Sequence, residues 1–232
     1  MKVLSTKLLD QKTIAYAHSL NLEVISAAFI EVTGVEIDIH SIPLEKFDAI
    51  VFTSANAVKY FLQQPGAFDL LKGKKILSLS GKTSVALLAN GIQPHLTATN
   101  AENLAHFIVQ NKIAQTVLHV CGNLVLDILK EKLKVAGIAY EKKVVYQTIL
   151  QKDLVVNEAF DFVMFLSPSA VESFYASNQY KNETICCCIG TTTAIALREK
   201  FPKAKIIYPK APSTVSMLDA IVCYSKTKKN TI

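Results

Sequence analysis

Four small residues stand where an apolar run of the sequence gives way to helix-like spacing, a position that suits anion binding. They are Ser54, Gly81, Ser167 and Gly190. Backbone N–H groups at the start of a helix are unpaired and carry partial positive charge, which favours a carboxylate or a phosphate. Serine at such a position also serves as an ordinary helix N-cap, and for each serine this alternative stays open. The pattern predicts turns that bind an acidic small molecule.

The motifs of the commoner phosphate, nucleotide and hydrolase sites are incomplete in this chain. Gly81-Lys82-Thr83 has the end of a P-loop, but Ile76 occupies the position where that motif requires its first glycine. No two glycines are spaced as G-x-G, and neither Ser54 nor Ser167 lies in a G-x-S-x-G turn. The five histidines are scattered without the spacing of a zinc site, so we predict no metal.

The elements that position these turns occur twice in the sequence. DAIVFTSANAVKYF, residues 48–61, shares Asp, Phe, Ser, Ala and Val with DFVMFLSPSAVESF, residues 161–174, at a constant offset of 113 positions. Two further pairs repeat the order of strand, turn and helix: ILSLSGKTSVALLANGI (76–92) with ICCCIGTTTAIALREKF (185–201), and ATNAENLAHFI (98–108) with APSTVSMLDAI (211–221). Near-continuous apolar strands that alternate with helices are typical of parallel sheets covered on both faces. The sequence therefore predicts two similar α/β units.

The order of the repeats indicates that one unit is built from both ends of the chain. Residues 116–148 and the N-terminal residues 2–32 both read as strand, helix, turn and strand. Residues 30–38 and 142–150 alternate as strands do, and we expect them to pair as a two-stranded ladder between the units. We expect a ligand crevice at the carboxyl ends of the strands. The expected domains are domain 1, residues 1–34 and 151–232, and domain 2, residues 35–150.

The run Cys186-Cys187-Cys188 falls within a predicted strand. Adjacent strand residues point to opposite faces, so Cys186 and Cys188 should share one face of the sheet and Cys187 the other. An odd total of five cysteines, without a C-x-x-C pair, does not suit a disulfide framework. We expect these thiols to be buried and to pack as small apolar groups.

Composition and charge favour a folded protein with an acidic partner. Half of the 232 residues are hydrophobic, and the formal net charge is +6, which suits nucleic acid, anionic lipid or a small polyanion. No RNA-binding aromatic motif or Cys/His finger accompanies this charge, so we expect no nucleic-acid partner, with a basic nucleic-acid binder kept as an alternative. No apolar run reaches the roughly 18–20 residues that span a bilayer, and the N-terminus lacks a signal peptide. We expect a cytoplasmic protein without a membrane partner and, since no heptad pattern is present, a monomer.

Several motifs together resemble the uroporphyrinogen-III synthase family. They follow the family's order over nearly the whole chain: VFTSANAV (51–58), NAENLAHFI (100–108), VCGN (120–123), LKEKLKVAGI followed by VVYQT (144–148), FLSPSAV (165–171) and CIGTTTAIAL (188–197). The resemblance implies two Rossmann-like or flavodoxin-like α/β domains joined by a two-stranded β-ladder, with the active site in the cleft between them. It implies that hydroxymethylbilane, a linear tetrapyrrole with eight carboxylates, is closed to uroporphyrinogen III with loss of water and inversion of ring D. It implies no metal and no organic cofactor.

The resemblance also implies which residues bind the substrate. Tyr146, in VVYQT, matches a tyrosine that the family is suspected of using as a proton donor, and the alternative is a packed strand aromatic. The substrate-binding residues implied for domain 2 are Thr53, Ser54, Ala55, Asn56, Gly81, Lys82, Thr83, Asn100, Ala101, Glu102, Gly122 and Asn123. Those implied for domain 1 are Ser167, Pro168, Ser169, Gly190, Thr191, Thr192, Thr193, Pro212 and Ser213. A non-catalytic two-lobed protein that binds a small anionic ligand is the alternative from another class.

Overall fold

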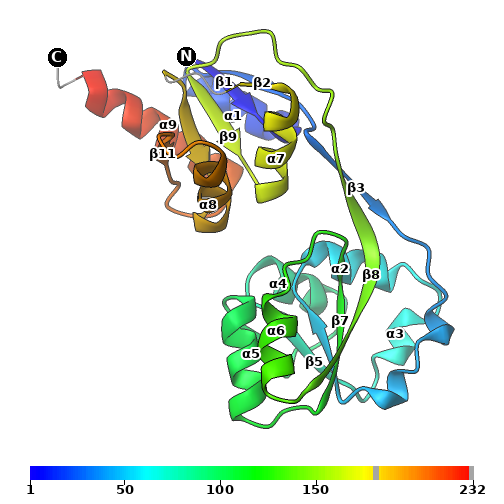
Figure 1. The fold of residues 1–232 in the computed structure, drawn as a ribbon. Coiled ribbons are helices and arrows are strands. Elements are labelled where there is room, and N and C mark those ends of the chain that lie inside the picture. Colours follow the sequence, from blue (N-terminus) through cyan, green and yellow to red (C-terminus); the bar gives the residue numbers. More distant parts are fainter. Residues whose placement is uncertain (180–182, 230–232) are drawn as a thin grey trace. The chain divides into compact units, whose positions relative to one another are not determined.

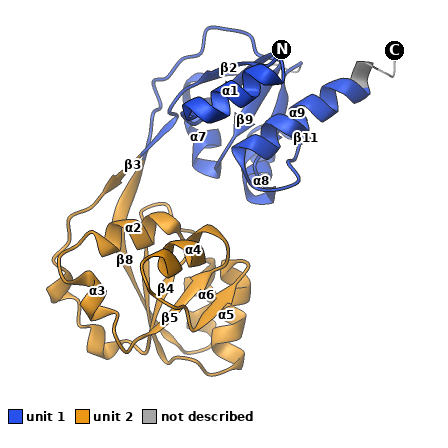
Figure 2. Cartoon of the chain, turned by 180° about the vertical axis from the view of Figure 1, so that it is seen from behind, with its two compact units in different colours: residues 1–31, 149–232 blue, residues 32–148 orange. Residues whose placement is uncertain are grey.

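The computed structural model describes residues 1–179 and 183–229, and within these residues the strands form two sheets (Figure 1). The chain divides into two compact units, coloured separately in Figure 2. Unit 1 comprises residues 1–31 and 149–232, and unit 2 comprises residues 32–148. Unit 2 is therefore a continuous segment that interrupts unit 1.

Unit 1 is a parallel sheet with helices on both faces. Its strand order is β11-β10-β9-β1-β2, and every neighbouring pair is parallel. Helices α7 and α8 pack an apolar cluster on one face, and α1 and α9 pack another on the opposite face. The elements are β1 (Lys2–Ser5), α1 (Gln11–Ser19), β2 (Glu23–Ser26), β9 (Phe162–Phe165), α7 (Pro168–Ser177), β10 (Ile185–Cys188), α8 (Thr191–Lys200), β11 (Lys205–Ile207) and α9 (Thr214–Lys229).

Unit 2 has the same three layers. Its sheet has the order β3-β8-β7-β4-β5-β6, with α2, α3 and α4 over one face and α5 and α6 over the other. Two short 3-10 turns, Ile39–Ser41 and Leu44–Lys46, precede β4. Strands β3 and β8 each extend two residues beyond residues 32–148. The elements are β3 (Ile30–Gly34), β4 (Ala49–Phe52), α2 (Ala55–Leu62), α3 (Ala67–Leu70), β5 (Lys75–Leu79), α4 (Lys82–Ala89), β6 (Leu96–Ala98), α5 (Ala101–Gln110), β7 (Thr116–Gly122), α6 (Ile128–Val135) and β8 (Ala139–Leu150).

The two sheets share one strand order, although the chain enters them at different strands. Strands β8-β7-β4-β5-β6 of unit 2 correspond in order to β2-β1-β9-β10-β11 of unit 1. For unit 1 this is the 2-1-3-4-5 order of flavodoxin-like folds. The prediction of two similar α/β units, each built on a sheet of parallel strands, is confirmed.

Strand β3 pairs with β8, as expected for the ladder, but it ends at Gly34 rather than at Asp38. The side chain of Gln64, which follows α2, bonds to the segment beyond Gly34. Its Nε2 donates to the Val35 carbonyl oxygen and its Oε1 accepts from the Ile37 N–H, both at 3.4 Å. The Val35 N–H still donates to the Val145 carbonyl oxygen of β8 at 2.9 Å, so the bonds to Gln64 begin where the ladder ends.

The three adjacent cysteines behave as their strand periodicity predicts. Cys186 and Cys188 belong to the apolar cluster under α7 and α8, whereas Cys187 belongs to the cluster under α1 and α9. All three are fully buried, and burial raises the pKa of each thiol, for Cys187 and Cys188 to about 12. Cys121 is also buried, while Cys223 is exposed.

Two negative findings apply to residues 1–179 and 183–229. No group of three or more His, Cys, Asp or Glu side chains there is placed to hold a metal ion. No helix there combines the length and the apolar character needed to cross a membrane.

Candidate active site

The turn residues predicted from the sequence lie at the carboxyl ends of strands in both sheets. Ser54 and Gly81 follow β4 and β5 in unit 2, and Ser167 and Gly190 follow β9 and β10 in unit 1. The Ser54 hydroxyl accepts a hydrogen bond from the N–H two residues later, and the Ser167 hydroxyl from the N–H three residues later, each at 3.1 Å. The capping role considered for the serines is therefore present at both, and it places each hydroxyl at a positive helix end.

In unit 2 the strand order reverses between β4 and β7, which are neighbours in the sheet but not in sequence. In open α/β sheets, ligands bind outside the carboxyl ends of the strands at such a reversal. The carboxyl end of β4 leads into Thr53 and Ser54, and that of β7 carries Gly122 and Asn123. Four of the predicted residues thus meet at the position where the fold itself favours a ligand.

A β-bulge brings Tyr146 to this position. Strands β7 and β8 pair in register as far as Cys121 with Val144, after which Gly122 pairs with Tyr146, so that Val145 is the extra residue. A Cβ atom at Gly122 would lie 2.4 Å from Tyr146 Cζ, so the ring covers the bare backbone of Gly122. Bulges of this kind redirect a side chain at the end of a ladder. The requirement for glycine at residue 122 follows from this close approach.

The phenol of Tyr146 is tied to the start of α2. Its hydroxyl donates to Ser54 Oγ at 3.1 Å, and its ring stacks on Tyr60 with the centroids 6.0 Å apart. Burial raises the pKa of Tyr146 above its ordinary value, against a smaller lowering by the Ser54 hydrogen bond. The hydroxyl is therefore protonated at neutral pH. Tyr146 is thus a packed strand aromatic whose hydroxyl donates a hydrogen bond at a helix end, and its role as a proton donor stays a prediction.

Sequence reasoning missed a second polar group in unit 2, built around His119 of β7. Its Nε2 lies 2.8 Å from Thr53 Oγ1, and its Nδ1 lies 2.8 Å from Tyr140 Oη. His119 is 1% exposed, and burial lowers its pKa from 6.5 to about 4, with the charge of Lys142 acting in the same direction. The ring is therefore neutral at neutral pH. The signal was in the repeat, where residues 116–148 aligned with residues 2–32 set His119 against a polar residue, Ser5, in an apolar strand.

Six further predicted residues of unit 2 lie in the first turns of helices: Ala55 and Asn56 in α2, Lys82 and Thr83 in α4, Ala101 and Glu102 in α5. Thr83 is 5% exposed, so its hydroxyl is turned into the fold, whereas Lys82 is exposed. Asn100 caps α5, accepting the Asn103 N–H at 2.8 Å. The Glu102 carboxylate pairs with the Lys132 ammonium at 3.0 Å. Of these six residues, Lys82 is therefore the one with an exposed positive charge.

Asn123 uses its side chain to extend the sheet. Its Oδ1 accepts from the Thr148 N–H at 2.8 Å and its Nδ2 donates to the Thr148 carbonyl oxygen at 3.3 Å. Its own N–H donates to the Tyr146 carbonyl oxygen at 3.2 Å. The side-chain amide therefore replaces one step of the β7–β8 ladder and holds β8 in the register that places Tyr146.

The predicted residues of unit 1 also gather at one edge of its sheet. Ser167, Pro168 and Ser169 begin α7, with the two serine hydroxyls 3.0 Å apart. Gly190 precedes α8, whose first residues are the exposed Thr191 and Thr192 and the 3%-exposed Thr193. Pro212 and Ser213 precede α9, and the Ser213 hydroxyl accepts the Ser216 N–H at 3.2 Å. A substrate site formed jointly by the two units stays a prediction from sequence.

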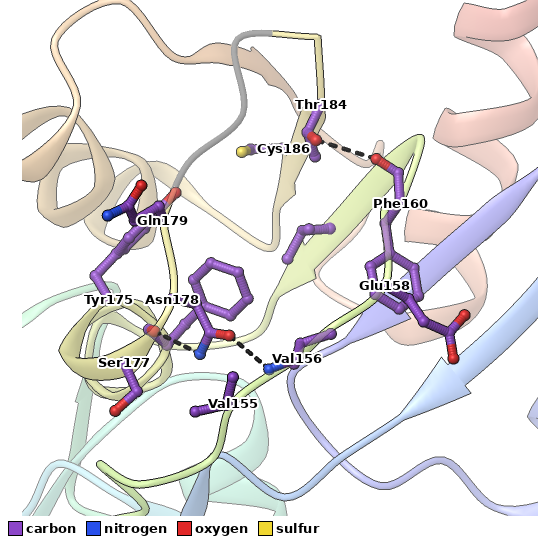
Figure 3. Close-up of a pocket in the computed structure, with 12 residues that line it drawn as sticks. Val155, Val156, Glu158, Phe160, Tyr175, Ser177, Asn178, Gln179, Thr184 and Cys186 are labelled. Atoms are coloured by element: carbon purple, nitrogen blue, oxygen red, sulfur yellow. Dashed lines mark hydrogen bonds between the residues drawn. The ribbon is translucent and has the colours of Figure 1, made fainter.

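The cavity in Figure 3 lies at the other end of the unit 1 strands. It has a volume of about 180 Å³, and its lining includes Phe160 and Thr184, which precede β9 and β10. The Thr184 hydroxyl donates to the Phe160 carbonyl oxygen at 3.0 Å. Ser167 and Gly190 lie at the carboxyl ends of these same strands, so we assign this cavity no part in the site.

The chain is similar to known proteins in both sequence and fold. The chain matches the family model of uroporphyrinogen-III synthase HemD over residues 11–219. A uroporphyrinogen-III synthase of Chlorobaculum parvum is 29% identical over 183 residues, which cover 71% of this chain and 74% of that protein. The crystal structure of a mutant uroporphyrinogen III synthase from Thermus thermophilus shares the fold with a TM-score of 0.75 at 17% identity, covering 98% of this chain and 99% of that one. The Helicobacter pylori 26695 uroporphyrinogen-III synthetase does so with a TM-score of 0.67 at 19% identity, covering 96% and 99%. Because the family model spans nearly the entire sequence, the chain belongs to the uroporphyrinogen-III synthase family.

Proposed function

We propose that this protein is a hydro-lyase that closes hydroxymethylbilane to uroporphyrinogen III, with release of water and inversion of ring D, in the biosynthesis of haem and other tetrapyrroles. The observation that carries the proposal is the family match over residues 11–219. The arrangement of Tyr146 against Ser54 at the strand-order reversal supplies a proton donor for the loss of water.

The ends of the strands suit the acidic side chains of such a substrate. In unit 2, α2, α4 and α5 each begin at the carboxyl edge of the sheet, so their first N–H groups face a ligand at that edge. In unit 1, α7 and α8 do the same. The formal charge of +6 attracts a polyanion over a longer range. Backbone groups can thus hold several carboxylates without a dedicated arginine for each.

Tyr146 is the residue that we propose as general acid. Its phenol gives a proton to the departing hydroxyl of the substrate, the C–O bond breaks with its electron pair on oxygen, and water leaves. The adjoining pyrrole nitrogen stabilises the cation that remains on carbon. After ring closure through a spiro intermediate, the phenolate takes back a proton from the product, so the enzyme is unchanged and the net loss is one water. The half-buried ring and the helix end near its oxygen suit this cycle.

The test is to mix the protein with freshly prepared hydroxymethylbilane and to separate the oxidised isomers. We expect the type III isomer, whereas the spontaneous type I isomer alone would favour the non-catalytic anion-binding protein. Tyr146→Phe should lower kcat by about 10²- to 10⁴-fold with a smaller change in KM. Tyr16→Phe removes a phenol hydroxyl that bonds to Asp219 on unit 1, and it serves as the matched control. Full turnover by Tyr146→Phe would return Tyr146 to a packing role.

We further propose that the protein acts as a monomer in the cytoplasm and binds no nucleic acid. The sequence supports the monomer because it has no heptad pattern, and it supports the last point because it has no nucleic-acid-binding motif. A substrate that is itself a small polyanion accounts for the positive charge. Sedimentation at working concentration checks the monomer. Salt-dependent retention of the protein on DNA or RNA, with a salt slope that reflects several phosphate contacts, would contradict the lack of nucleic-acid binding.

A further inference from the structure

The polar chain Tyr140–His119–Thr53 lies on one face of the unit 2 sheet. Both of its links are 2.8 Å long, and His119 is fully enclosed between them. Tyr140 and Thr53 are half-buried, and Thr53 is the residue that follows β4 at the strand-order reversal. This row of hydrogen bonds therefore leads from Tyr140 through His119 to the predicted ligand position.

A neutral imidazole has one donor nitrogen and one acceptor nitrogen, so two arrangements satisfy these distances. In the first, the Tyr140 O–H donates to Nδ1 and Nε2–H donates to Thr53 Oγ1. In the second, Nδ1–H donates to Tyr140 Oη and the Thr53 O–H donates to Nε2. The first leaves the Thr53 hydrogen without an acceptor among the described residues, and the second leaves the Tyr140 hydrogen without one. A phenol is a stronger hydrogen-bond donor than a neutral imidazole N–H, which favours the first arrangement, and the Thr53 hydrogen is then available to a ligand.

Unit 1 has the same fold but lacks these three hydrogen-bonded side chains. The strand registers make Ser5 the counterpart of His119, and the offset of the repeat makes Leu166 the counterpart of Thr53. Leu166 packs against an apolar cluster, and the Ser5 hydroxyl turns to the Lys7 carbonyl oxygen at 2.7 Å. The fold therefore does not require a buried histidine here. Its presence in unit 2 points to a role at the carboxyl end of the strand.

We propose that His119 is a positioning residue whose Nε2–H donates to Thr53 Oγ1, so that the Thr53 hydroxyl hydrogen points away from the sheet and donates to a carboxylate arm of the substrate. This deepens the function proposed above and depends on it for the identity of the anion. Thr53 directly precedes Ser54, which accepts from Tyr146. The donor thus fixes one carboxylate at the same carboxyl edge of the sheet at which Tyr146 protonates the leaving hydroxyl. Because the ring is buried and neutral, it keeps this orientation through the catalytic cycle.

The first measurement is the tautomer of His119. In protein labelled with ¹⁵N at both histidine ring nitrogens, we expect His119 to carry its proton on Nε2, with Nδ1 as an unprotonated acceptor, around pH 7. Comparison with the His119→Gln spectrum assigns the signal. A proton on Nδ1 overturns the proposal, and this reading needs no substrate and no activity.

The second measurement separates positioning from stability. Thr53→Val should raise KM for hydroxymethylbilane by about 10- to 100-fold, the worth of one hydrogen bond to a charged group, with kcat changed less. His119→Gln keeps an amide donor near Nε2 and should retain most of the affinity. His119→Asn places its amide nearer Nδ1 and should resemble Thr53→Val. His106→Gln, on the exposed surface of α5, is the control that should leave both constants unchanged.

The double variant decides whether His119 acts through Thr53. If it does, His119→Asn adds no further rise in KM once Thr53 is Val, whereas independent effects would multiply and would overturn the proposal. An unchanged KM in Thr53→Val overturns it as well. A wild-type protein that makes only the type I isomer would instead reject the proposed function, while the tautomer would still decide the hydrogen-bond direction.

Discussion

Acid should weaken unit 2 through His119, and the size of the effect follows from its burial. The folded-state pKa is about 4, against 6.5 for the free side chain. Below pH 6.5 the unfolded chain binds a proton that the folded chain refuses, so the stability contributed by the neutral ring is complete above pH 6.5 and is lost as pH falls toward 4. This difference corresponds to roughly 3 kcal/mol when both forms are titrated, and to about 2 kcal/mol between pH 7 and pH 5.

The assay is urea unfolding, followed by far-UV circular dichroism between pH 7 and pH 5, for the wild type and for His119→Gln. The amide does not titrate, so the free energy of unfolding of the variant should fall by about 2 kcal/mol less over this range. Asp10 and Asp48 also have lowered pKa values, because backbone N–H groups donate to them, but they are the same in both proteins and cancel in the difference. Parallel stability curves for the two proteins would refute the assignment of a buried, neutral His119.

Three further predictions concern packing. Gly122→Ala should cost about 1–3 kcal/mol of stability by overpacking against Tyr146, and the cost should shrink in a Tyr146→Ala background; an equal cost in both would contradict the close approach. Asn123→Ala should lower stability by about 0.5–1.5 kcal/mol and speed amide exchange at Thr148, and unaltered exchange would show that the side-chain ladder contributes nothing. A thiol reagent should label Cys223 rapidly in the folded protein and the other four cysteines only after unfolding, so a second fast thiol would contradict their burial.

The architecture could be predicted from the sequence because it is encoded twice. The pairs at an offset of 113 preserve both the apolar strand and the residue that caps the next helix, and Ser54 and Ser167 are those caps in the structure. The alternation across Cys186–Cys188 likewise depends only on strand periodicity, and it assigned each thiol to its face. Local signals of this kind need no knowledge of distant partners.

The features that sequence reasoning missed depend on register between distant segments. The chain Thr53–His119–Tyr140 forms because β7 lies between β4 and β8. The position of Tyr146 over Gly122 depends on a bulge that no residue type announces. Beyond the end of β3 the backbone bonds to Gln64, a half-buried residue of ordinary type. Each is a tertiary pairing that overrides a local pattern.

The interruption of unit 1 by unit 2 also sets an order of events during synthesis. Strand β1 occupies an inner position of its sheet beside β9, where Val3 pairs with Phe162. During synthesis, β1 therefore cannot pair with β9 until residues 162–165 have been made, by which time residues 32–148 have already emerged as a complete unit. Until β9 emerges, the apolar side chains of β1, such as Val3 and Leu4, lack their neighbouring strand, and exposed apolar surface of this kind is prone to aggregation.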